Sequence, residues 1–354
     1  YVVSLLAIMH AGHFAVPLDR GLSDARLAHI LDDAQINTIV GEGIENWPDA
    51  EVINLSEVEA HSVGPISQRE LGGYIIYTSG STGKPKGVQV AAKALTFHLA
   101  SLAQRFASLT DKHILHFTNL SVDTAFEQLF LGLVEGANIY LKPDELWDTA
   151  QFWQAVLTCN IQVTDLPPSY LLTLLADDHS AQQFKQSMLE HIVLGGEAFP
   201  QKVSDYWHTH NLWQQVRLWN AYGPTEATIT ATFENITSDM SAPVPLGQLL
   251  AGRSAQVVDQ YGHMQPSQFP GELLLGGLGL ANGYLHQPEL TQSRFINTTG
   301  GRFYKTGDLV YQDTQANIHF LGRTDHQVKV RGFRVELQEI EHVLASFSGI
   351  GTAA

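Results

Sequence analysis

Short apolar runs alternate with helical segments through the first 240 residues, and no other feature constrains the fold of this chain as strongly. The strand-like runs are INTIVG, GGYIIYTS, ANIYLK, IQVTDL, HIVLGGEA and VRLWNAYG. Segments with helical periodicity lie among them, namely SDARLAHILDDA, TAFEQLFLGLVEG, SYLLTLLADD and PQKVSDYWHTH. Alternation of this kind predicts an α/β fold in which helices cover largely parallel sheets.

The pattern changes near Ser241 to shorter strands and glycine-rich turns such as GELLLGGLGLANGY. This predicts an α/β core over residues 1–240 and a β-rich subdomain of the same lobe over 241–324. After the turn Arg323–Asp325 the chain has strand and helix patterns again. One helical face there combines Leu337, Ile340, Val343 and Leu344. Residues 325–354 are therefore expected to form a separate segment of strand, turn, strand and helix.

Composition excludes several classes of function. The 354 residues carry 20 basic and 36 acidic side chains, a net charge of −16, which disfavours nucleic acid or an anionic membrane as the main partner. The single cysteine, Cys159, excludes an internal disulfide and a thiolate zinc cluster, so we expect a reducing, cytoplasmic location. No run of 18 apolar residues is present, and the apolar start lacks the basic flank of a signal peptide. The close histidine pairs, His113/His116 and His208/His210, lack a third ligand at a usual spacing.

The stretch YTSGSTGKPKGV, residues 77–88, has the composition of a loop that wraps an anion with backbone amides and hydroxyl groups. A P-loop needs four residues between its first glycine and the Gly-Lys-Ser/Thr triplet. Here only Ser81 and Thr82 separate Gly80 from Gly83, and Pro85 follows Lys84. The sequence therefore predicts a phosphate-binding loop that is not a P-loop.

Three of the predicted strands end in glycine or polar residues. HIVLGGEA ends in Gly195 and Gly196, VRLWNAYGPTEAT continues to Thr225 and Glu226, and GGYIIYTS runs into the loop at 77–88. Ligands of open α/β sheets bind beyond the carboxyl ends of strands. A glycine pair that admits a flat ring, a carboxylate for Mg²⁺ and an anion-binding loop together outline an ATP·Mg²⁺ site.

Four of these segments resemble, in order, the motif series of the adenylate-forming superfamily: YTSGSTGKPKGV, NAYGPTEAT, FYKTGDL and GRTDHQVKVRGFRVELQEIE. More narrowly, the chain is similar to adenylation domains of non-ribosomal peptide synthetases over essentially its whole length, including the flanking AGHFAVPLD and GELLLGGLGLANGYLHQPELT. The family also has a segment before AGHFAVPLD and most of a C-terminal lobe, which carries a lysine that contacts the reacting groups. Neither is in this chain.

The resemblance implies attack of a carboxylate on the α-phosphate of ATP, giving an acyl-adenylate and pyrophosphate. It implies that the loop from Thr78 to Lys86 closes as a mobile element over the β- and γ-phosphates. Such a transfer depends on in-line positioning and charge neutralisation more than on covalent help. The loop groups expected to contribute are Thr78, Ser79, Gly80, Ser81, Thr82, Gly83, Lys84 and Lys86.

The resemblance also assigns the nucleotide contacts. Tyr222 is expected to stack on adenine and Thr225 to contact the α-phosphate, and Glu226 is the expected Mg²⁺ ligand. Asp308 is expected to accept both ribose hydroxyls, with support from Arg323. The edge of adenine is expected to meet Asn220, Ala221, Gly223 and the backbone of Gly195, Gly196 and Glu197.

SVDTAFEQLF aligns with the substrate helix of the family and places Asp123 as the partner of an α-ammonium group. Asp123 and Glu127 are four residues apart, so they share a helix face, which Leu131 and Val134 continue as an apolar wall. Independently, Asp165 ends the alternating strand IQVTD. The other expected pocket positions are Thr124, Val193, Gly195, Ala221, Ile229 and Thr230.

The pocket would thus hold two acids, Glu127 and Asp165, beyond the one for the amino group. Buried carboxylates without partners are costly or take up protons. We therefore expect a basic substrate, namely lysine, ornithine, arginine or diaminobutyrate. The alternative is that Glu127 pairs with a local hydrogen-bond donor and the pocket is of mixed polarity.

Two other functions compete with amino-acid activation. An acyl- or aryl-CoA ligase of the same superfamily would act on acids without an α-amino group, so Asp123 discriminates between them. A lobe that binds nucleotide and amino acid with little turnover would follow from the missing lysine. In the family, a small α+β C-terminal lobe rotates about a hinge. The resemblance implies that residues 325–354 are this hinge, matched by Asp325 and followed by Lys329, and the incomplete beginning of that lobe. This implies a peptidyl carrier domain with a phosphopantetheine arm as partner, with condensation domains as neighbours in a larger chain.

Overall fold

The computed structural model describes residues 1–42, 50–58, 70–80, 84–143, 145–240, 243–325, 327–330, 332–345 and 347, and the structural statements below concern these residues. Among them, no helix is long and apolar enough to cross a membrane.

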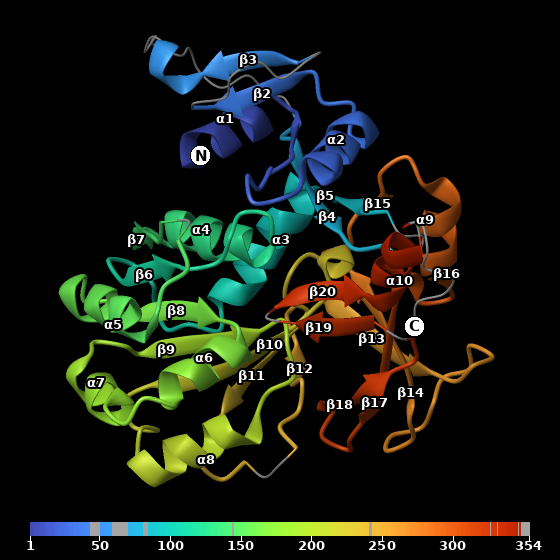
Figure 1. The fold of residues 1–354 in the computed structure, drawn as a ribbon. Coiled ribbons are helices and arrows are strands. Elements are labelled where there is room, and N and C mark those ends of the chain that lie inside the picture. The colour runs from blue at the N-terminus through green and yellow to red at the C-terminus, as the bar shows by residue number, and fades with distance from the viewer. Residues whose placement is uncertain are drawn as a thin grey trace.

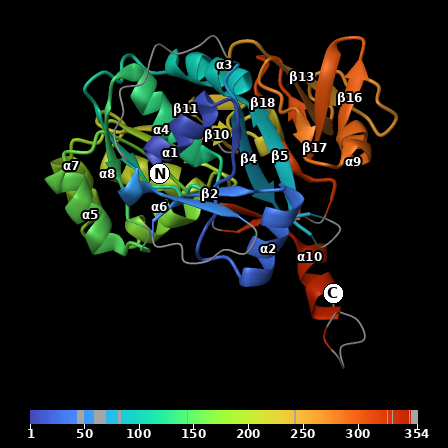
Figure 2. The ribbon, with the colours of Figure 1, turned by 90° about the horizontal axis from the view of Figure 1, so that it is seen from above.

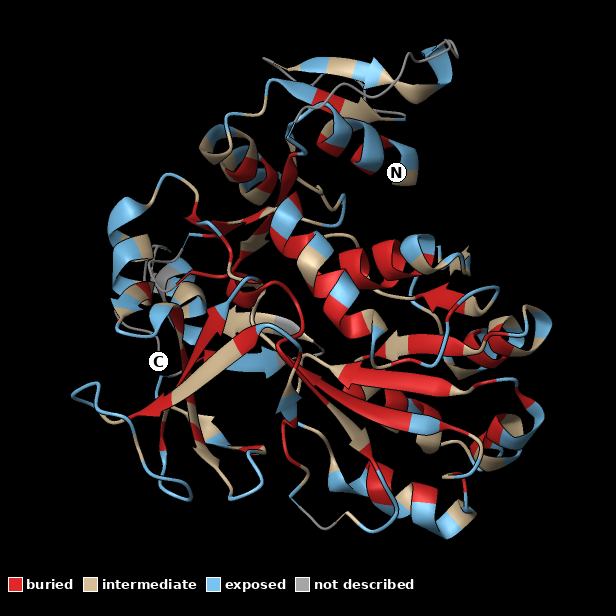
Figure 3. Ribbon diagram, turned by 180° about the vertical axis from the view of Figure 1, so that it is seen from behind, coloured by how far each residue is buried: buried red, intermediate tan, exposed pale blue. Residues whose placement is uncertain are grey.

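A seven-stranded sheet forms the centre of the larger part of the molecule (Figure 1). Its order is β12 (Gln248–Leu249), β11 (Thr232–Ile236), β10 (Arg217–Tyr222), β9 (His191–Gly195), β8 (Val163–Leu166), β6 (His113–His116) and β7 (Asn138–Leu141). The five strands from β10 to β7 are parallel, and β11 and β12 add antiparallel to β10. Much of this sheet is buried, as its colouring in Figure 3 shows. The predicted α/β fold with a largely parallel sheet is confirmed.

Helices cover this sheet. They are α3 (Ala92–Ala103), α4 (Thr124–Glu135), α5 (Thr149–Thr158), α6 (Pro168–Leu175), α7 (Ser180–Gln186) and α8 (Gln201–His210). Local sequence sets their ends. Asp148 and Gln151 form a reciprocal capping box at the start of α5, and α4 ends at Gly136, whose φ of 72° is the left-handed conformation that favours glycine.

A four-stranded sheet combines β1 (Phe14–Ala15), β4 (Gly73–Thr78), β5 (Lys86–Ala91) and β15 (Gly283–Tyr284). Strands β4 and β5 pair antiparallel, so the loop between Thr78 and Lys86 is the connection of a hairpin. The N-terminal segment beside this sheet contains α1 (Val2–His10), α2 (Asp24–Asp33), β2 (Thr38–Gly41), β3 (Glu51–Asn54) and the 3-10 turn Leu55–Glu57.

An antiparallel sheet follows in the region predicted to be rich in strands. It comprises β13 (Arg253–Val258), β14 (Gly271–Gly277), β17 (Gly301–Gln312), β16 (Phe295–Thr298) and β18 (Ile318–Arg323), with α9 (Pro288–Arg294) packed beside β15 and β16. Two short strands of the same region pair elsewhere, because β12 joins the seven-stranded sheet and β15 joins β5. The β-rich segment is thus bonded into both neighbouring sheets.

The hairpin β19 (Gln327–Val330) and β20 (Phe333–Glu336) leads into α10 (Leu337–Ala345). In Figure 1 the hairpin lies between the seven-stranded sheet and the antiparallel sheet, and in Figure 2 α10 extends away from the body of the molecule. The predicted apolar face of this helix is exposed, with Ile340 at 49%. Arg26 of α2 reaches α10 and pairs with Glu339 at 3.0 Å.

Candidate active site

A cleft of about 2500 Å³ lies where β8, β9 and β10 end, and it extends to the end of β4. Its position follows the rule that the carboxyl ends of parallel strands meet at one edge of a sheet. Most of the residues predicted for the site line this cleft. They are Thr78, Ser79, Asp123, Thr124, Glu127, Asp165, Val193, Gly195, Gly196, Ala221, Tyr222, Gly223, Thr225, Ile229, Thr230, Asp308 and Arg323.

Other predicted residues lie behind or beside the cleft wall, outside its lining. They are Gly80, Lys84, Lys86, Glu197, Asn220, Glu226 and Asp325. The predictions for Ser81, Thr82 and Gly83 fall outside the residues that the structure describes.

The end of β4 presents hydroxyl groups to the cleft. Thr78 is buried, and its Oγ1 has no hydrogen-bond partner in the described part of the chain. The hydroxyl of the next residue, Ser79, donates to the main-chain oxygen of Arg334 at 2.8 Å. A buried, unsatisfied hydroxyl beside a cleft is suited to a ligand oxygen, because burial without a partner costs free energy.

Two lysines flank the hairpin loop in different environments. Lys84 is exposed. Lys86 is buried, with its Nζ 4.9 Å from the centroid of the Tyr284 ring. Burial, assisted by the nearby charge of Arg334, lowers the pKa of Lys86 to about 8, so this side chain is mostly a cation at neutral pH.

Glu226 lies in the 3-10 turn Thr225–Ala227 and is fully buried. Nη1 of Arg334 lies 3.1 Å from each carboxylate oxygen, and the Tyr284 hydroxyl donates to Oε1 at 2.7 Å. Burial alone would raise the pKa of Glu226, but the charges of Arg334 and Lys86 outweigh it and lower that pKa to about 2. Glu226 is therefore ionised and satisfied by protein donors.

The expected role of Glu226 as a Mg²⁺ ligand does not fit this conformation. Its carboxylate is engaged by Arg334 and Tyr284. Among the described residues, no group of three or more His, Cys, Asp or Glu side chains could hold a metal ion. A Mg²⁺ ion bound through one carboxylate and substrate phosphates would need Arg334 to leave, so the metal role of Glu226 stays a prediction.

Asp308, on β17, lies beside Tyr222 at the edge of the cleft. The Tyr222 hydroxyl donates to Oδ2, and Arg323 Nη1 donates to Oδ1 at 2.6 Å. Arg323 also donates to both oxygens of Asp325, at 2.6 and 2.8 Å, so one guanidinium connects the two carboxylates. Each Asp308 oxygen keeps a further lone pair, which a diol could use. Nζ of Lys329 lies 5.7 Å from the Tyr222 ring centroid.

The positions expected at the adenine edge differ in what they contact. Gly196 has a φ of 82°, a conformation that favours glycine, and a Cβ there would make a tight contact of 3.3 Å with Gly332. Glu197 accepts hydrogen bonds from Ser169 and from Gly332 N. The Asn220 amide donates to Pro245 O at 2.8 Å, behind the cleft. A nucleotide role for Asn220 stays a prediction.

At the other end of the cleft, Asp123 directly precedes α4 and is buried. Burial, together with the charges of Glu127 and Glu226, raises its pKa to about 6, although a hydrogen bond with the Thr225 side chain opposes this shift. Asp165 is partly buried, and burial together with the charge of Glu127 holds its pKa well above the usual range. Two acids with raised pKa values line one cavity, which makes this end of the cleft a candidate functional site.

Glu127 has a local partner that the sequence did not reveal. Its Oε2 lies 2.6 Å from Nε2 of His98, a fully buried residue of α3, and His98 Nδ1 lies 3.2 Å from Nη2 of Arg253. His98 is isolated among apolar residues, and Arg253 is more than 100 residues away, so no local signal identified either. The predicted apolar face of α4 extends only to Leu131, because Val134 is 68% exposed.

Arg334 is a further residue that sequence analysis missed, although it lies in the motif that was noted. Its contact with Glu226 spans 108 residues, so only the folded chain reveals it.

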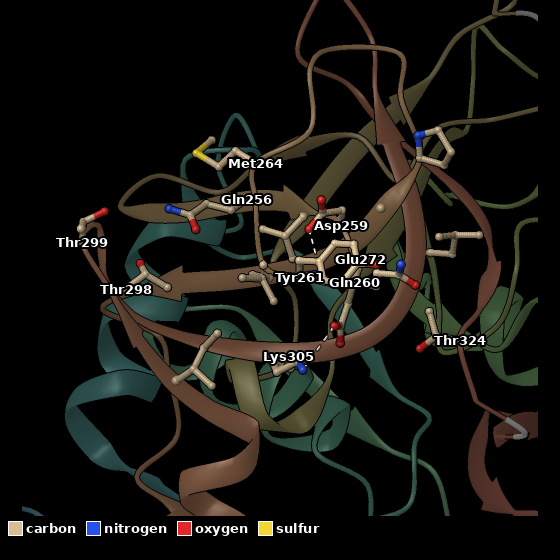
Figure 4. A pocket seen from close by; sticks show the side chains of 17 residues that line it. Gln256, Asp259, Gln260, Tyr261, Met264, Glu272, Thr298, Thr299, Lys305 and Thr324 are labelled. Atoms are coloured by element: carbon tan, nitrogen blue, oxygen red, sulfur yellow. Dashed lines mark hydrogen bonds and ion pairs between the residues drawn. The ribbon is translucent and has the colours of Figure 1, made fainter.

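A second, smaller pocket of about 700 Å³ lies on the antiparallel sheet (Figure 4). Gln256, Asp259, Tyr261 and Met264 border it, and Lys305 lies 3.6 Å from Glu272 there. None of the predicted site residues lines this pocket.

Known proteins resemble this chain over its whole length. Surfactin synthase subunit 1 of Bacillus subtilis is 34% identical over 99% of the chain, and bacitracin synthase 3 of Bacillus licheniformis is 34% identical over 100%. The chain spans only 10% and 6% of these two relatives.

Solved structures show the same fold. One is holo-PA1221, an NRPS protein containing adenylation and PCP domains, with a TM-score of 0.86, 24% identity, and coverage of 99% of this chain and 62% of that chain. Another is o-succinylbenzoate CoA synthetase of Bacillus subtilis, with a TM-score of 0.85, 21% identity, and coverage of 99% and 71%.

This chain thus shares its fold with these two proteins. The chain itself belongs to the family of AMP-binding enzymes, which it matches over residues 1–285.

Proposed function

We propose that this chain is the amino-acid-activating part of a larger peptide synthetase, which converts ATP and an amino acid into an aminoacyl-adenylate and pyrophosphate. The carrying observation is that one cleft is lined both by the expected nucleotide-side groups, Thr78 and Asp308, and by two acids with raised pKa values, Asp123 and Asp165. Similarity to the surfactin and bacitracin synthases supports the proposal.

In the proposed reaction, a carboxylate oxygen of the amino acid attacks the α-phosphorus of ATP, and the bond from that phosphorus to the bridging oxygen breaks to release pyrophosphate. Asp123 binds the α-ammonium group and so orients the attacking carboxylate. Asp308 binds the ribose hydroxyls and the Thr78 hydroxyl donates to a phosphate oxygen, while the buried Lys86 cation adds positive charge from behind the cleft wall. Their contribution is positioning and charge neutralisation rather than covalent chemistry.

The substrate class proposed here is an amino acid with one cationic group on its side chain. None of the ion pairs formed by the described residues involves Asp165, whereas Glu127 contacts His98 at 2.6 Å. Gln128 is the side-chain hydrogen-bond partner of Asp165. A substrate cation beside Asp165 would offset the cost of its ionisation in this partly buried position.

We further propose that a peptidyl carrier domain with a phosphopantetheine arm receives the aminoacyl group. The solved NRPS protein that contains adenylation and PCP domains supports this partner. A hinge at Asp325 is supported by Arg323, which contacts both Asp325 and the cleft residue Asp308. Rotation of the chain at Asp325 would therefore take place directly beside the cleft.

Amino-acid-dependent exchange between pyrophosphate and ATP in the full-length protein tests the proposal. Lysine, ornithine, arginine and diaminobutyrate are compared with glutamine and leucine, and the expected result is exchange with one or more basic amino acids. The variant Asp123→Ala should lose this exchange. A CoA ligase would instead activate acids without an amino group and would tolerate Asp123→Ala, which would reject the amino-acid assignment.

A further inference from the structure

Three charged or titratable side chains form a buried chain behind the wall of the cleft. Glu127 lines the cleft, while His98 and Arg253 do not. His98 is inaccessible to solvent and Arg253 is 9% exposed. The hydrogen bonds run from Glu127 Oε2 to His98 Nε2 at 2.6 Å, and from His98 Nδ1 to Arg253 Nη2 at 3.2 Å.

The chemistry of arginine fixes the tautomer of this histidine. A guanidinium group has only donors, so His98 Nδ1 must accept from Arg253. The remaining ring hydrogen therefore lies on Nε2 and is donated to Glu127. Neutral His98 thus connects a carboxylate to a guanidinium, and Glu127 is satisfied from within the protein.

Arg253 also holds the backbone of the opposite cleft wall. It donates to the main-chain oxygens of Ala227, Thr228 and Thr230, the last two at 3.1 and 3.2 Å. Thr228 and Ile229 have φ values of 54° and 65°, which is the left-handed region and is rare for β-branched residues. Such backbone persists only where surrounding contacts determine it, and Arg253 supplies three of them.

We propose that His98 and Arg253 are positioning residues that set substrate selectivity from behind the wall. This inference rests on the proposed function. His98 donates a hydrogen bond to Glu127, so this carboxylate of the cleft wall is satisfied without a substrate cation. Arg253 fixes the backbone of Thr228 and Thr230 and so positions the side chains of Ile229 and Thr230. The substrate cation is consequently recognised by Asp165 alone, so the site accepts one side-chain positive charge.

Two isosteric variants of the full-length protein test this division of roles. Selectivity is measured as the ratio of kcat/KM for the best basic amino acid to that for glutamine. Asp165→Asn should reduce this ratio about 10- to 150-fold, the range that corresponds to a lost charged hydrogen bond. Glu127→Gln should change it less than about threefold, because the amide oxygen of glutamine still accepts from His98.

Variants of His98 test the positioning role. His98→Leu should raise the KM for the amino acid about tenfold or more while the KM for ATP stays unchanged. His98→Gln should keep the amino-acid KM close to that of the wild-type protein. The amide nitrogen and oxygen of glutamine are bonded to one planar carbon, as are the two ring nitrogens of imidazole, so glutamine can donate to Glu127 and accept from Arg253. His191→Leu is the matched control, because His191 is buried at the amino end of β9, away from the cleft.

The outcomes separate this inference from the proposed function. Equal loss of selectivity in Glu127→Gln and Asp165→Asn would overturn the inference while leaving amino-acid activation intact. An unchanged amino-acid KM in folded His98→Leu would do the same. Should His98→Leu fail to fold, the two isosteric variants still decide. Absence of exchange with every amino acid in the wild-type protein would overturn the proposed function itself.

Discussion

Asp123 shows how the fold changes the chemistry of a single side chain. Its carboxyl is buried beside Glu127, and both effects disfavour the charged form, so its pKa rises to about 6. An α-ammonium group needs the charged form. Binding of such a group therefore depends on pH in a range where an exposed aspartate would already be fully ionised.

Activity is consequently predicted to fall as the pH is lowered through about 6. Below that pH the free protein carries protonated Asp123, so kcat/KM for the amino acid should decrease, and it should recover as Asp123 ionises above that pH. Asp123→Asn should lower kcat/KM about 10- to 150-fold at neutral pH and abolish this inflection. Pyrophosphate exchange at subsaturating amino acid measures both, and an inflection that persists in Asp123→Asn would assign it to another group.

Among the elements, the segment Gly223–Thr230 is a part of the cleft that depends on close backbone packing. A Cβ at Gly223 would lie 1.9 Å from the Ile229 oxygen, so only glycine fits the observed backbone. The same segment contains the left-handed Thr228 and Ile229. Because Gly223 has no side chain, the backbone of Ile229 can pass close to it, and Ile229 and Thr230 can line the cleft.

Gly223→Ala should therefore displace this wall. We expect a loss of about 1–3 kcal/mol in the free energy of unfolding, the usual cost of overpacking, and a raised KM for the amino acid. Gly300→Ala is the control, because the nearest atom there is the end of the flexible Gln256 side chain at 3.0 Å. Thermal unfolding and exchange kinetics measure both effects. Equal behaviour of the two variants would contradict the role of Gly223.

The elements that carry the cleft were predictable because their signals are local. The strand that ends at Gly195 and the helix that begins at Thr124 appear at the expected residues. Their signals, a short apolar run and a helical spacing of apolar residues, depend only on residues close together in the sequence. The pairing of Glu127 with His98 was not predictable, because it depends on how α3 packs against α4. The short strand β15 was equally hidden, since it pairs with a hairpin almost 200 residues earlier.

At the scale of the whole molecule, Arg334 joins the C-terminal hairpin to the rest of the chain. Its side chain pairs with Glu226, and its main-chain oxygen accepts from Ser79. A third contact comes from Gly332, which donates to Glu197. The hairpin is thus attached both at the end of β4 and at the segment that follows β9.

Arg334→Met should loosen this attachment. Removing one partner of a buried ion pair lowers the free energy of unfolding by about 3–5 kcal/mol. The loss should be smaller here, because the charge of Lys86 still lies near Glu226. Amide hydrogen exchange in β19 and β20 should increase. Arg26→Met removes only the more exposed pair with Glu339 and should change exchange there little. Unchanged protection in Arg334→Met would show that other contacts hold the hairpin.

Arg323 bonds Asp308 at the cleft edge and Asp325 at the start of the C-terminal segment with a single planar group. Because the guanidinium group is planar and rigid, any rotation that changes its hydrogen bond to one carboxylate also changes its hydrogen bonds to the other. In the proposed function, occupancy of the ribose position at Asp308 and rotation of the C-terminal segment at Asp325 are therefore coupled events, so a measurement of either one also reports on the other.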